Sequence, residues 1–270
     1  MTDARELLAL AESTAHAAGE LLMRARLGTI EVADTKTSPT DVVTAADLAS
    51  EQLIRDRVSA ARPDDAFIGE EGDDIAGSSG VTWLADPIDG TVNYLYGIPQ
   101  FSVSIAAQHD GVTIAGVVHN PVSGETFTAV RGGGARLDGA AITVSRQTDV
   151  AQTLVGTGFG YRADVRRHQV AETAALLPTV RDIRRLGSAA LDLCNVACGR
   201  LDAYVERGLK PWDLAAGRLV VTEAGGRVEG INGAEPGELL VVAAPVDLFD
   251  TFHAALVQSG FAEWPMTDWP

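Results

Sequence analysis

The sequence has little cysteine and little positive charge. Its 270 residues include 2 cysteines, and 21 lysines and arginines stand against 37 aspartates and glutamates, which gives a formal charge of −16. Two cysteines cannot form the disulfide framework of a small secreted protein, so we expect a reducing, cytoplasmic environment. We expect Cys194 and Cys198 to be small core residues of one helix, and their response to oxidants is left open. Because a broad basic face is excluded, we expect no nucleic-acid partner.

Long hydrophobic runs are also missing. The longest stretch without Asp, Glu, Lys or Arg, residues 90–109, contains Asn93, Pro99 and several serines and glutamines. A membrane-spanning helix does not tolerate such residues, so we expect no membrane partner. Acidic residues interrupt the start of the chain, where a targeting leader would be positively charged. The sequence has no P-loop motif, and its five histidines share no spacing typical of zinc ligands.

Hydrophobic residues make up 46% of the chain, which is enough for a sizeable core. Apolar residues at steps of three and four from Leu7 to Leu22 predict an amphipathic helix, and a second helix is expected from about Asp47. Residues 66–144 contain short β-rich runs separated by turn residues, which indicates the hairpins of an antiparallel sheet. These runs are residues 66–68, 83–85, 101–106, 112–119 and 126–130.

Strands and helices alternate in the second half, which is typical of an α/β arrangement. The polar connection at residues 146–149 favours a boundary near residue 148, with an N-terminal α+β domain (1–148) and a C-terminal α/β domain (149–270). The expected strands are residues 153–156, 181–185, 203–206, 227–229 and 239–243, and the expected helices are residues 164–177, 188–198, 213–224 and 246–258.

One glycine-rich segment superficially matches a dinucleotide-binding fingerprint. Gly156, Gly158 and Gly160 follow an expected strand, but the third glycine comes one position early and Tyr161 stands in its place. An approximate match of this kind is weak, so we do not assign nucleotide binding to it.

The most informative segment is Asp86-Pro87-Ile88-Asp89-Gly90, which follows an apolar strand. Proline fixes the backbone without offering a donor, and glycine allows the chain to reverse, so the two aspartates can converge. Two carboxylates repel each other unless a cation lies between them, and Mg²⁺ prefers carboxylate and carbonyl oxygens. A plain type I turn is the alternative interpretation.

Two further segments carry acids where a metal site could use them. Glu70 and Glu71 lie between glycines directly after an expected strand, and Asp213 stands at an expected helix start. Taken singly, the glutamates could be solvated loop residues and Asp213 could be a helix N-cap.

Together these segments resemble the inositol monophosphatase family of Mg²⁺-dependent, lithium-sensitive phosphatases, and the resemblance covers nearly the whole chain. It implies a layered αβαβα sandwich, with an antiparallel sheet and two helices in the first half and an α/β sheet in the second, and it implies a homodimer. The matching motifs are Asp41-Val-Val-Thr44-x-x-Asp47, Gly69-Glu70-Glu71, Asp86-Pro-Ile-Asp89-Gly-Thr91-x-Asn93, Trp212-Asp213-x-Ala215-Ala216-Gly217 and Thr222-Glu-Ala-Gly225-Gly226.

The resemblance implies two to three Mg²⁺ ions in one site. It assigns the first ion to Glu70, Asp86 and the Ile88 carbonyl, and the second to Asp86, Asp89 and Asp213, with Glu70 also holding a weaker third ion. In this arrangement bound water attacks phosphorus in line. The resemblance gives water activation to Thr91 with Asp47, while Asp47 alternatively serves only as the N-cap of its helix.

The resemblance also implies a set of substrate contacts. Backbone amides of Gly90 and Thr91 would receive the phosphate, and a mobile flap would carry Lys36 and Asp41. Three of these residues have alternative interpretations. Glu206 could lie on an exposed strand, Arg184 could belong to a structural ion pair, and Lys36 could be a solvated charge. The implied substrate-binding residues are Asp89, Gly90, Thr91, Arg184, Gly187, Ser188, Ala189, Glu206 and Asp213.

The predicted function is hydrolysis of a small phosphate ester, with a polyol monophosphate, and myo-inositol 1-phosphate in particular, as the favoured substrate. Departures from the family pattern at Gly72, Val92 and Lys210-Pro211 leave histidinol phosphate and fructose 1,6-bisphosphate open. A regulatory binding protein that keeps the fold is the non-enzymatic alternative.

Overall fold

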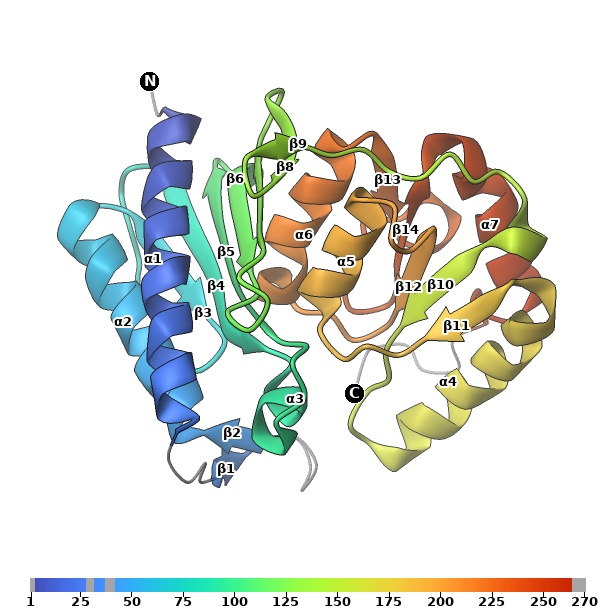
Figure 1. Ribbon diagram of the computed structural model, residues 1–270, viewed down its shortest axis with the longest axis horizontal. Helices are drawn as coiled ribbons and strands as arrows, with labels where there is room; N and C mark the ends of the chain where they lie inside the picture. Colours follow the sequence, from blue (N-terminus) through green and yellow to red (C-terminus); the bar gives the residue numbers. More distant parts are fainter. Residues whose placement is uncertain (1–2, 28–31, 37–41, 264–270) are drawn as a thin grey trace.

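The computed structural model describes residues 3–27, 32–36 and 42–263, and it stacks helices and sheets in five layers (Figure 1). Helices α1 (Ala4–Ala25) and α2 (Ala45–Ala61) cover one face of a seven-stranded sheet, and α5 (Ala189–Ala197) and α6 (Pro211–Glu223) lie between this sheet and a five-stranded one. Helices α4 (Ala163–Leu176) and α7 (Val246–Gln258) lie on the far side of the smaller sheet. The expected αβαβα sandwich is confirmed.

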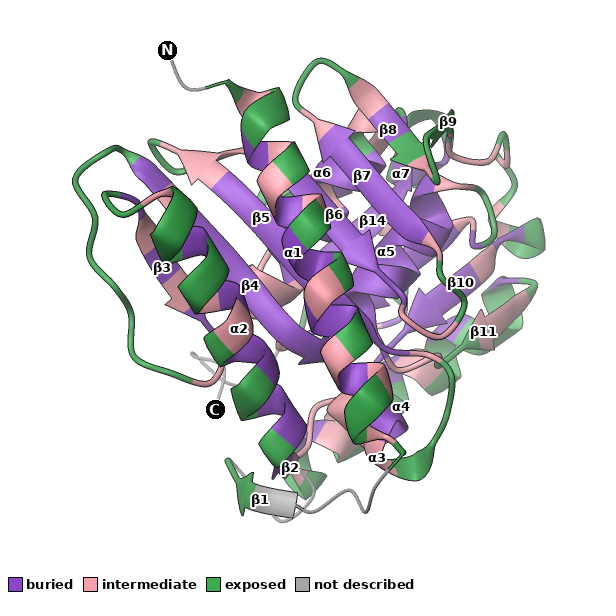
Figure 2. Ribbon diagram, turned by 60° about the vertical axis from the view of Figure 1, so that its left-hand side comes forward, coloured by how far each residue is buried: buried purple, intermediate pink, exposed green. Residues whose placement is uncertain are grey.

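The larger sheet has the order β3-β4-β5-β6-β7-β8-β9, and its central strands are buried (Figure 2). Strands β4 to β9 pair antiparallel, as predicted, but β3 is parallel to β4. The prediction of an antiparallel hairpin was therefore wrong for β3. Residues 70–80 return the chain to the end of the sheet where β3 began, so β4 runs in the same direction as β3. The strands are β3 (Ala66–Gly69), β4 (Val81–Asp89), β5 (Ser102–His109), β6 (Val112–His119), β7 (Thr126–Val130), β8 (Gly134–Leu137) and β9 (Ala140–Ala141).

The smaller sheet has the order β11-β10-β12-β14-β13 and is mixed. Strand β10 is parallel to β11 and β12, whereas β14 is antiparallel to β12 and β13. The strands are β10 (Leu154–Thr157), β11 (Asp182–Arg184), β12 (Ala203–Glu206), β13 (Gly226–Glu229) and β14 (Val241–Pro245), and a separate pair is formed by β1 (Val32–Thr35) and β2 (Val42–Thr44).

Helix α1 follows directly from its sequence pattern. Asp3 caps it by accepting a hydrogen bond from the Arg5 amide at 2.8 Å. Its apolar stripe is almost entirely buried against β5 and β6, and the alanines in that stripe allow the helix to approach the sheet closely. The stripe consists of Leu7, Ala11, Ala15, Ala18 and Leu22.

Helix α2 starts earlier than its sequence pattern suggests. Thr44 is the N-cap, and the carboxylate of Asp47, at the third helical position, accepts hydrogen bonds from the Thr44 amide (2.8 Å) and hydroxyl (2.6 Å). The interpretation of Asp47 as the N-cap is therefore wrong. It belongs to a capping box, in which the acidic residue reaches back to the cap.

One continuous hydrophobic core joins the two sheets through α5 and α6. Leu84 and Val118 of the larger sheet pack in the same cluster as Leu191 of α5, Val220 of α6 and Tyr204 of the smaller sheet. The division of the chain into two domains at residue 148 stays a prediction.

In the part of the chain that the structure describes, none of the helices has the length and apolar character needed to cross a membrane.

The cysteines lie at the end of α5. Cys194 is fully buried and Cys198 is half-buried, and burial raises the pKa of both thiols. The prediction of a core residue is confirmed for Cys194, whereas Cys198 follows the helix as its C-cap and packs against the edge of the core.

Candidate active site

The end of β4 is irregular where its two aspartates occur. Asp86 pairs with Ser104 and Asp89 with Ser102, so three steps along β4 match two along β5. Pro87 supplies no ladder donor at this bulge, and Gly90 follows in a left-handed conformation (φ 98°). A Cβ at Gly90 would lie 2.9 Å from the Gly187 carbonyl oxygen, which makes glycine necessary at this position.

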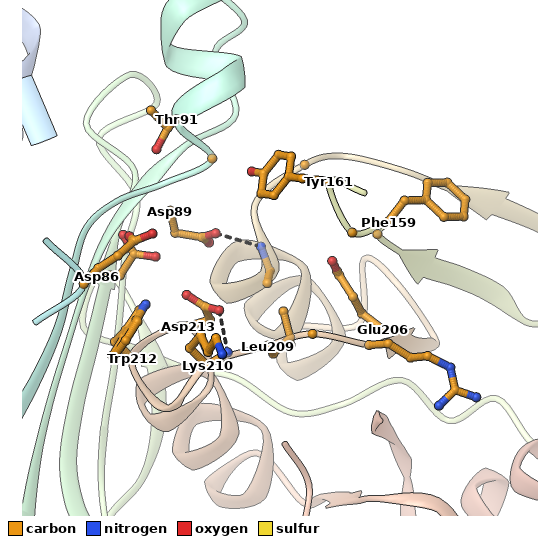
Figure 3. Close-up of a pocket in the computed structure, with 18 of the residues that line it drawn as sticks. Asp86, Asp89, Thr91, Phe159, Tyr161, Glu206, Leu209, Lys210, Trp212 and Asp213 are labelled. Atoms are coloured by element: carbon orange, nitrogen blue, oxygen red, sulfur yellow. Dashed lines mark hydrogen bonds between the residues drawn. The ribbon is translucent and has the colours of Figure 1, made fainter. Parts of the chain in front are cut away.

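Four carboxylates from three separate segments line one pocket beside this bulge (Figure 3). Glu70 follows β3, Asp86 and Asp89 end β4, and Asp213 lies in the first turn of α6. Asp213 is not an N-cap, contrary to that alternative. It is the third residue of the helix, which begins at Pro211, and its carboxylate accepts the Lys210 amide at 2.7 Å.

Burial and mutual repulsion govern these acids. Burial raises the pKa of Asp86 and Asp213 well above the ordinary value, and the charges of Glu70 and Asp89 raise both further. Burial also raises the pKa of Asp89, to about 6, against the opposing effect of its hydrogen bonds. Such crowding is unfavourable without a cation, so the site has a strong electrostatic preference for one.

Asp89 is held by the start of α5. Its carboxylate accepts hydrogen bonds from the Ser188 hydroxyl at 2.5 Å, the Ala190 amide at 2.7 Å and the Ala189 amide at 3.1 Å. Ser188 is the buried N-cap of this helix. Gly187 and Ala189 line the pocket, whereas the Ser188 side chain is occupied by Asp89.

Lys36 reaches into the pocket from the early loop. Its ammonium group lies 2.7 Å from carboxylate oxygens of both Glu70 and Glu71, so its interpretation as a solvated charge is wrong. Burial acts to lower the pKa of Lys36, but the charge of Glu70 and the hydrogen bonds to both glutamates raise it overall. Burial raises the pKa of Glu71 to about 7. Asp41, the other predicted flap residue, lies outside the described residues.

Thr91 and Asp47 meet as the sequence motif implies. The Thr91 hydroxyl lies 3.0 Å from an Asp47 carboxylate oxygen and 3.0 Å from the Ile88 carbonyl oxygen. Asp47 is fully buried, and this burial raises its pKa to about 6 despite hydrogen bonds from Thr44 and Thr91. Its position beside Thr91 suits a group that accepts a proton through that hydroxyl.

The donor chemistry of the pocket fits a hard divalent cation. Carboxylates and the Ile88 backbone converge there, and oxygen ligands of this kind suit Mg²⁺. In the described part of the chain, however, no group of three His, Cys, Asp or Glu side chains is already arranged to hold a metal ion. Glu70 pairs with Lys36, and Asp89 accepts hydrogen bonds from the start of α5.

The opposite end of the pocket contains Glu206. Strand β12 lies between β10 and β14, so the interpretation of Glu206 as a residue of an exposed strand is wrong. The Tyr204 hydroxyl donates to its carboxylate, and burial raises the pKa of Glu206 to about 7. Figure 3 shows Glu206 across the pocket from Asp86, Asp89 and Asp213. The pocket volume is about 270 Å³.

The arginine at this end differs from the predicted one. Arg184 is exposed and pairs with Asp182 at 2.6 Å, which confirms the alternative of a structural ion pair, and the neighbouring Arg185 lines the pocket instead. In a strand, successive side chains point to opposite faces, and a sequence pattern as short as Arg184-Arg185 does not say which one faces inward.

Sequence reasoning missed one wall of the pocket. Gly158, Phe159, Gly160 and Tyr161, from the segment set aside as a failed nucleotide motif, also line this pocket, and Gly158 lies against the Glu206 carboxylate. The signal was available: this segment follows the carboxyl end of a parallel strand, where ligand sites in α/β sheets commonly lie.

The whole chain resembles proteins of known family. A family model described as the inositol monophosphatase family matches residues 3–259. An inositol-1-monophosphatase of Mycobacterium leprae is 48% identical over 232 residues, which cover 82% of this chain and 80% of that protein.

Two further comparisons extend this similarity. A protein of Pasteurella multocida named Nus factor SuhB is 41% identical over 244 residues, covering 88% of this chain and 91% of that protein. The solved structure of Mycobacterium tuberculosis SuhB is similar with a TM-score of 0.83 and 40% identity, covering 97% of this chain and 100% of that one.

Proposed function

The chain belongs to the inositol monophosphatase family of phosphatases, and on this premise we propose that it is a Mg²⁺-dependent phosphomonoesterase acting on a polyol monophosphate, myo-inositol 1-phosphate above all. The convergence of Glu70, Asp86, Asp89 and Asp213 on one pocket carries the proposal. Their crowding would be relieved by divalent cations, and the paired Thr91 and Asp47 lie at the same end.

The carboxylates of Glu70, Asp86, Asp89 and Asp213, with the Ile88 carbonyl, would hold two to three Mg²⁺ ions. When bound, these ions supply a nucleophilic water at neutral pH and stabilise charge on the leaving oxygen. We also propose that this chain shares the lithium sensitivity of the family, with Li⁺ acting at these same metal-binding residues. Glu70 would have to exchange its contact with Lys36 for the cation, while Lys36 keeps its ion pair with Glu71.

Thr91 and Asp47 would handle the proton of the attacking water. The threonine hydroxyl donates to Asp47 and can accept from a water in the pocket, so it orients that water for in-line attack. The amides of Gly90 and Thr91, at the start of α3 (Thr91–Tyr96), would donate to the phosphate oxygens.

The alcohol would be bound at the other end. Glu206 accepts hydrogen bonds from hydroxyl groups, and Gly187 and Ala189 present backbone atoms there. A volume of about 270 Å³ lies near the lower limit of ligand pockets, so it favours a compact monophosphate over a dinucleotide-sized ester. Histidinol phosphate and fructose 1,6-bisphosphate remain the alternative substrates.

The proposed setting of the enzyme is a cytoplasmic homodimer. The low cysteine content supports a reducing compartment, and family membership supports the dimer. Light scattering on purified protein tests the dimer: a mass near twice 28.3 kDa is expected, and a mass near 28.3 kDa contradicts it.

A second function, in regulation through a macromolecular partner, is favoured by the relative named Nus factor SuhB. The intact set of four carboxylates argues that catalysis is kept whether or not such a role exists.

Phosphate release tests the proposal most directly. Myo-inositol 1-phosphate, L-histidinol phosphate and fructose 1,6-bisphosphate are compared with and without Mg²⁺. We expect Mg²⁺-dependent release and at least about a tenfold higher kcat/KM for the inositol ester. Preference for another ester would overturn the substrate, and no release from any ester would favour the binding role.

A further inference from the structure

Helix α4 buries two polar side chains at positions where a hydrophobic residue would be the simpler choice. Gln169 and Glu172 are only 4% and 3% exposed, and they lie on the same helix face as the buried Val165 and Leu176. Burying polar groups is unfavourable unless each is hydrogen-bonded, so the partners of these two residues indicate what they do.

Gln169 holds the segment 158–162, the first of two walls at the end of the pocket that contains Glu206, where we propose that the alcohol binds. Its side-chain oxygen accepts the Gly160 amide at 2.9 Å, and Arg166 of the same helix donates to the Gly160 carbonyl at 2.6 Å. Both backbone groups of Gly160 are thereby attached to α4. Gly160 belongs to the segment 158–162, which lines the pocket through Phe159 and Tyr161.

Glu172 holds the second wall. Its carboxylate accepts two hydrogen bonds from Arg207, at 2.6 and 3.2 Å, and the Arg207 side chain is 3% exposed. Arg207 also donates to the Leu239 and Phe261 carbonyls, each at 2.5 Å. It directly follows Glu206 and belongs to the segment 206–210, so the ion pair fixes the backbone that carries Glu206.

The two walls touch each other at Glu206. A Cβ added to Gly158 would lie 2.0 Å from a Glu206 carboxylate oxygen, so the first wall passes directly over this carboxylate. A shift of either wall therefore displaces Glu206 or closes on it. At the opposite end Asp89 is held by α5, and Asp213 accepts the amide of Lys210, the residue where the second wall meets α6.

We infer that Gln169 and Glu172 are positioning residues that fix the two walls of the alcohol end, segments 158–162 and 206–210, and thereby set which alcohol the enzyme accepts. The inference rests on the proposed function for its substrate, and it deepens that function by separating alcohol selection from the phosphate chemistry. Neither residue lines the pocket. Each acts through the backbone that it holds, in the way that distant packing sets reacting geometry.

Two substrates separate these roles. p-Nitrophenyl phosphate offers the same phosphate group with a flat alcohol that lacks the hydroxyls of a polyol. In Gln169→Leu we expect the KM for myo-inositol 1-phosphate to rise about tenfold, while kcat for p-nitrophenyl phosphate stays within about twofold. Thr173→Val, one turn along α4, is the matched control, because the Thr173 hydroxyl donates within α4, to the Gln169 carbonyl.

Removal of Glu172 alone would leave the Arg207 charge buried and could unfold the protein. We therefore pair Glu172→Leu with Arg207→Met in one double variant, which replaces the ion pair by apolar side chains of similar size. A folded double variant with the same selective rise in KM supports the inference. A folded variant with unchanged selectivity shows that the pair is merely structural and overturns it.

Hydrogen exchange gives a readout that does not depend on the substrate. Amides in 158–162 should exchange faster in Gln169→Leu, and amides in 206–210 faster in the double variant, while residues 86–91 stay unchanged. Unchanged exchange in both walls overturns the inference. If the wild type instead prefers another ester of the panel, the proposed substrate fails, and the selectivity comparison is made with the preferred ester.

Discussion

Single residues in this pocket have distinct proposed roles, and the role of the Asp213 charge in metal binding is the simplest to test. Its carboxylate keeps its contact with the Lys210 amide only if an oxygen remains in place, so Asp213→Asn preserves the hydrogen bond but removes the negative charge. We expect kcat to fall by more than about a hundredfold, which is the upper end for losing a supporting contact of a metal site. Steady-state phosphate release measures it.

The same substitution should not harm folding of the metal-free protein. Burial and neighbouring charges already oppose ionisation of Asp213, so a neutral amide relieves repulsion. Asp149→Asn, at an exposed position outside the pocket, is the control. Near-normal turnover by Asp213→Asn would contradict the metal-binding assignment.

Thr91 provides a second test at the residue scale. Thr91→Val keeps the shape but removes the hydroxyl that bonds to Asp47, so we expect kcat to drop by about 10²–10⁴-fold. Thr91→Ser keeps the hydroxyl and should retain most of the activity. If Val and Ser variants lose activity equally, the hydroxyl has no role in moving a proton. The measurement is kcat against pH for the three proteins.

Acid titration gives a third prediction. The pKa of Asp89 is raised from its ordinary value of 3.8 to about 6 in the folded protein. Between these values the folded, metal-free protein binds more protons than the unfolded chain, so this group's stabilisation is complete below about pH 4 and is lost as pH rises through about 6. Asp89→Asn should reduce the measured slope by the share of this group, while Asp47, whose pKa is also raised to about 6, keeps its own share. Urea unfolding in EDTA at pH 4 to 7 measures it.

Mg²⁺ should reverse this loss at neutral pH. A cation that binds only the folded protein stabilises it by about 2.7 kcal/mol at a hundredfold excess over Kd. A Mg²⁺-independent melting temperature in the wild type at pH 7 would contradict a cation site among these carboxylates.

At the scale of elements, the loop after β3 depends on a contact with α2. Glu51 of α2 is buried, and its carboxylate accepts the amides of Glu71 (2.7 Å) and Gly72 (2.8 Å) and pairs with Arg55 (2.8 Å). Glu51 thereby fixes the backbone that presents Glu70. A Cβ at Gly69 would lie 2.5 Å from this carboxylate, so the close approach requires glycine.

Gly69→Ala should therefore disturb both stability and metal affinity. The carboxylate cannot retreat without losing its amide partners, so we expect a destabilisation of about 1–3 kcal/mol, typical of overpacking, and weaker activation by Mg²⁺. Gly237→Ala is the control, because a Cβ there meets nothing within 4 Å. Thermal melts and Mg²⁺ titrations of activity measure the two effects, and an unchanged Mg²⁺ dependence would refute the role of Glu51.

At the scale of the whole molecule, α5 and α6 tie the two sheets into one core. Apolar residues of both sheets pack against these helices, and α5 also holds Asp89 of the larger sheet. We therefore expect a single cooperative unfolding transition, with equal calorimetric and van't Hoff enthalpies. Two separate transitions would show that residues 1–148 and 149–270 fold independently.

The sequence was sufficient to predict the layered fold and the acids of the site. Helix α1 and the strands β6 and β7 follow from short-range periodicity, which depends only on neighbours along the chain. The wrong predictions lie where contacts with residues outside the local pattern decide the structure. Strand β4 continues through Asp89 although a turn motif begins at Asp86. Asp47 and Asp213 are the third residues of their helices rather than the N-caps.

The chemistry of this protein was determined by residue types in ordered motifs, because carboxylates at a strand end can be recognised without coordinates. Which residues surround Glu206 in the pocket was decided only by tertiary structure. Arg185 rather than Arg184 lines the pocket, Glu206 lies in a central strand of the smaller sheet, and Gly160 and Arg207 are held by α4. Such contacts join residues far apart in the chain, and their free energy depends on burial that no local sequence pattern specifies.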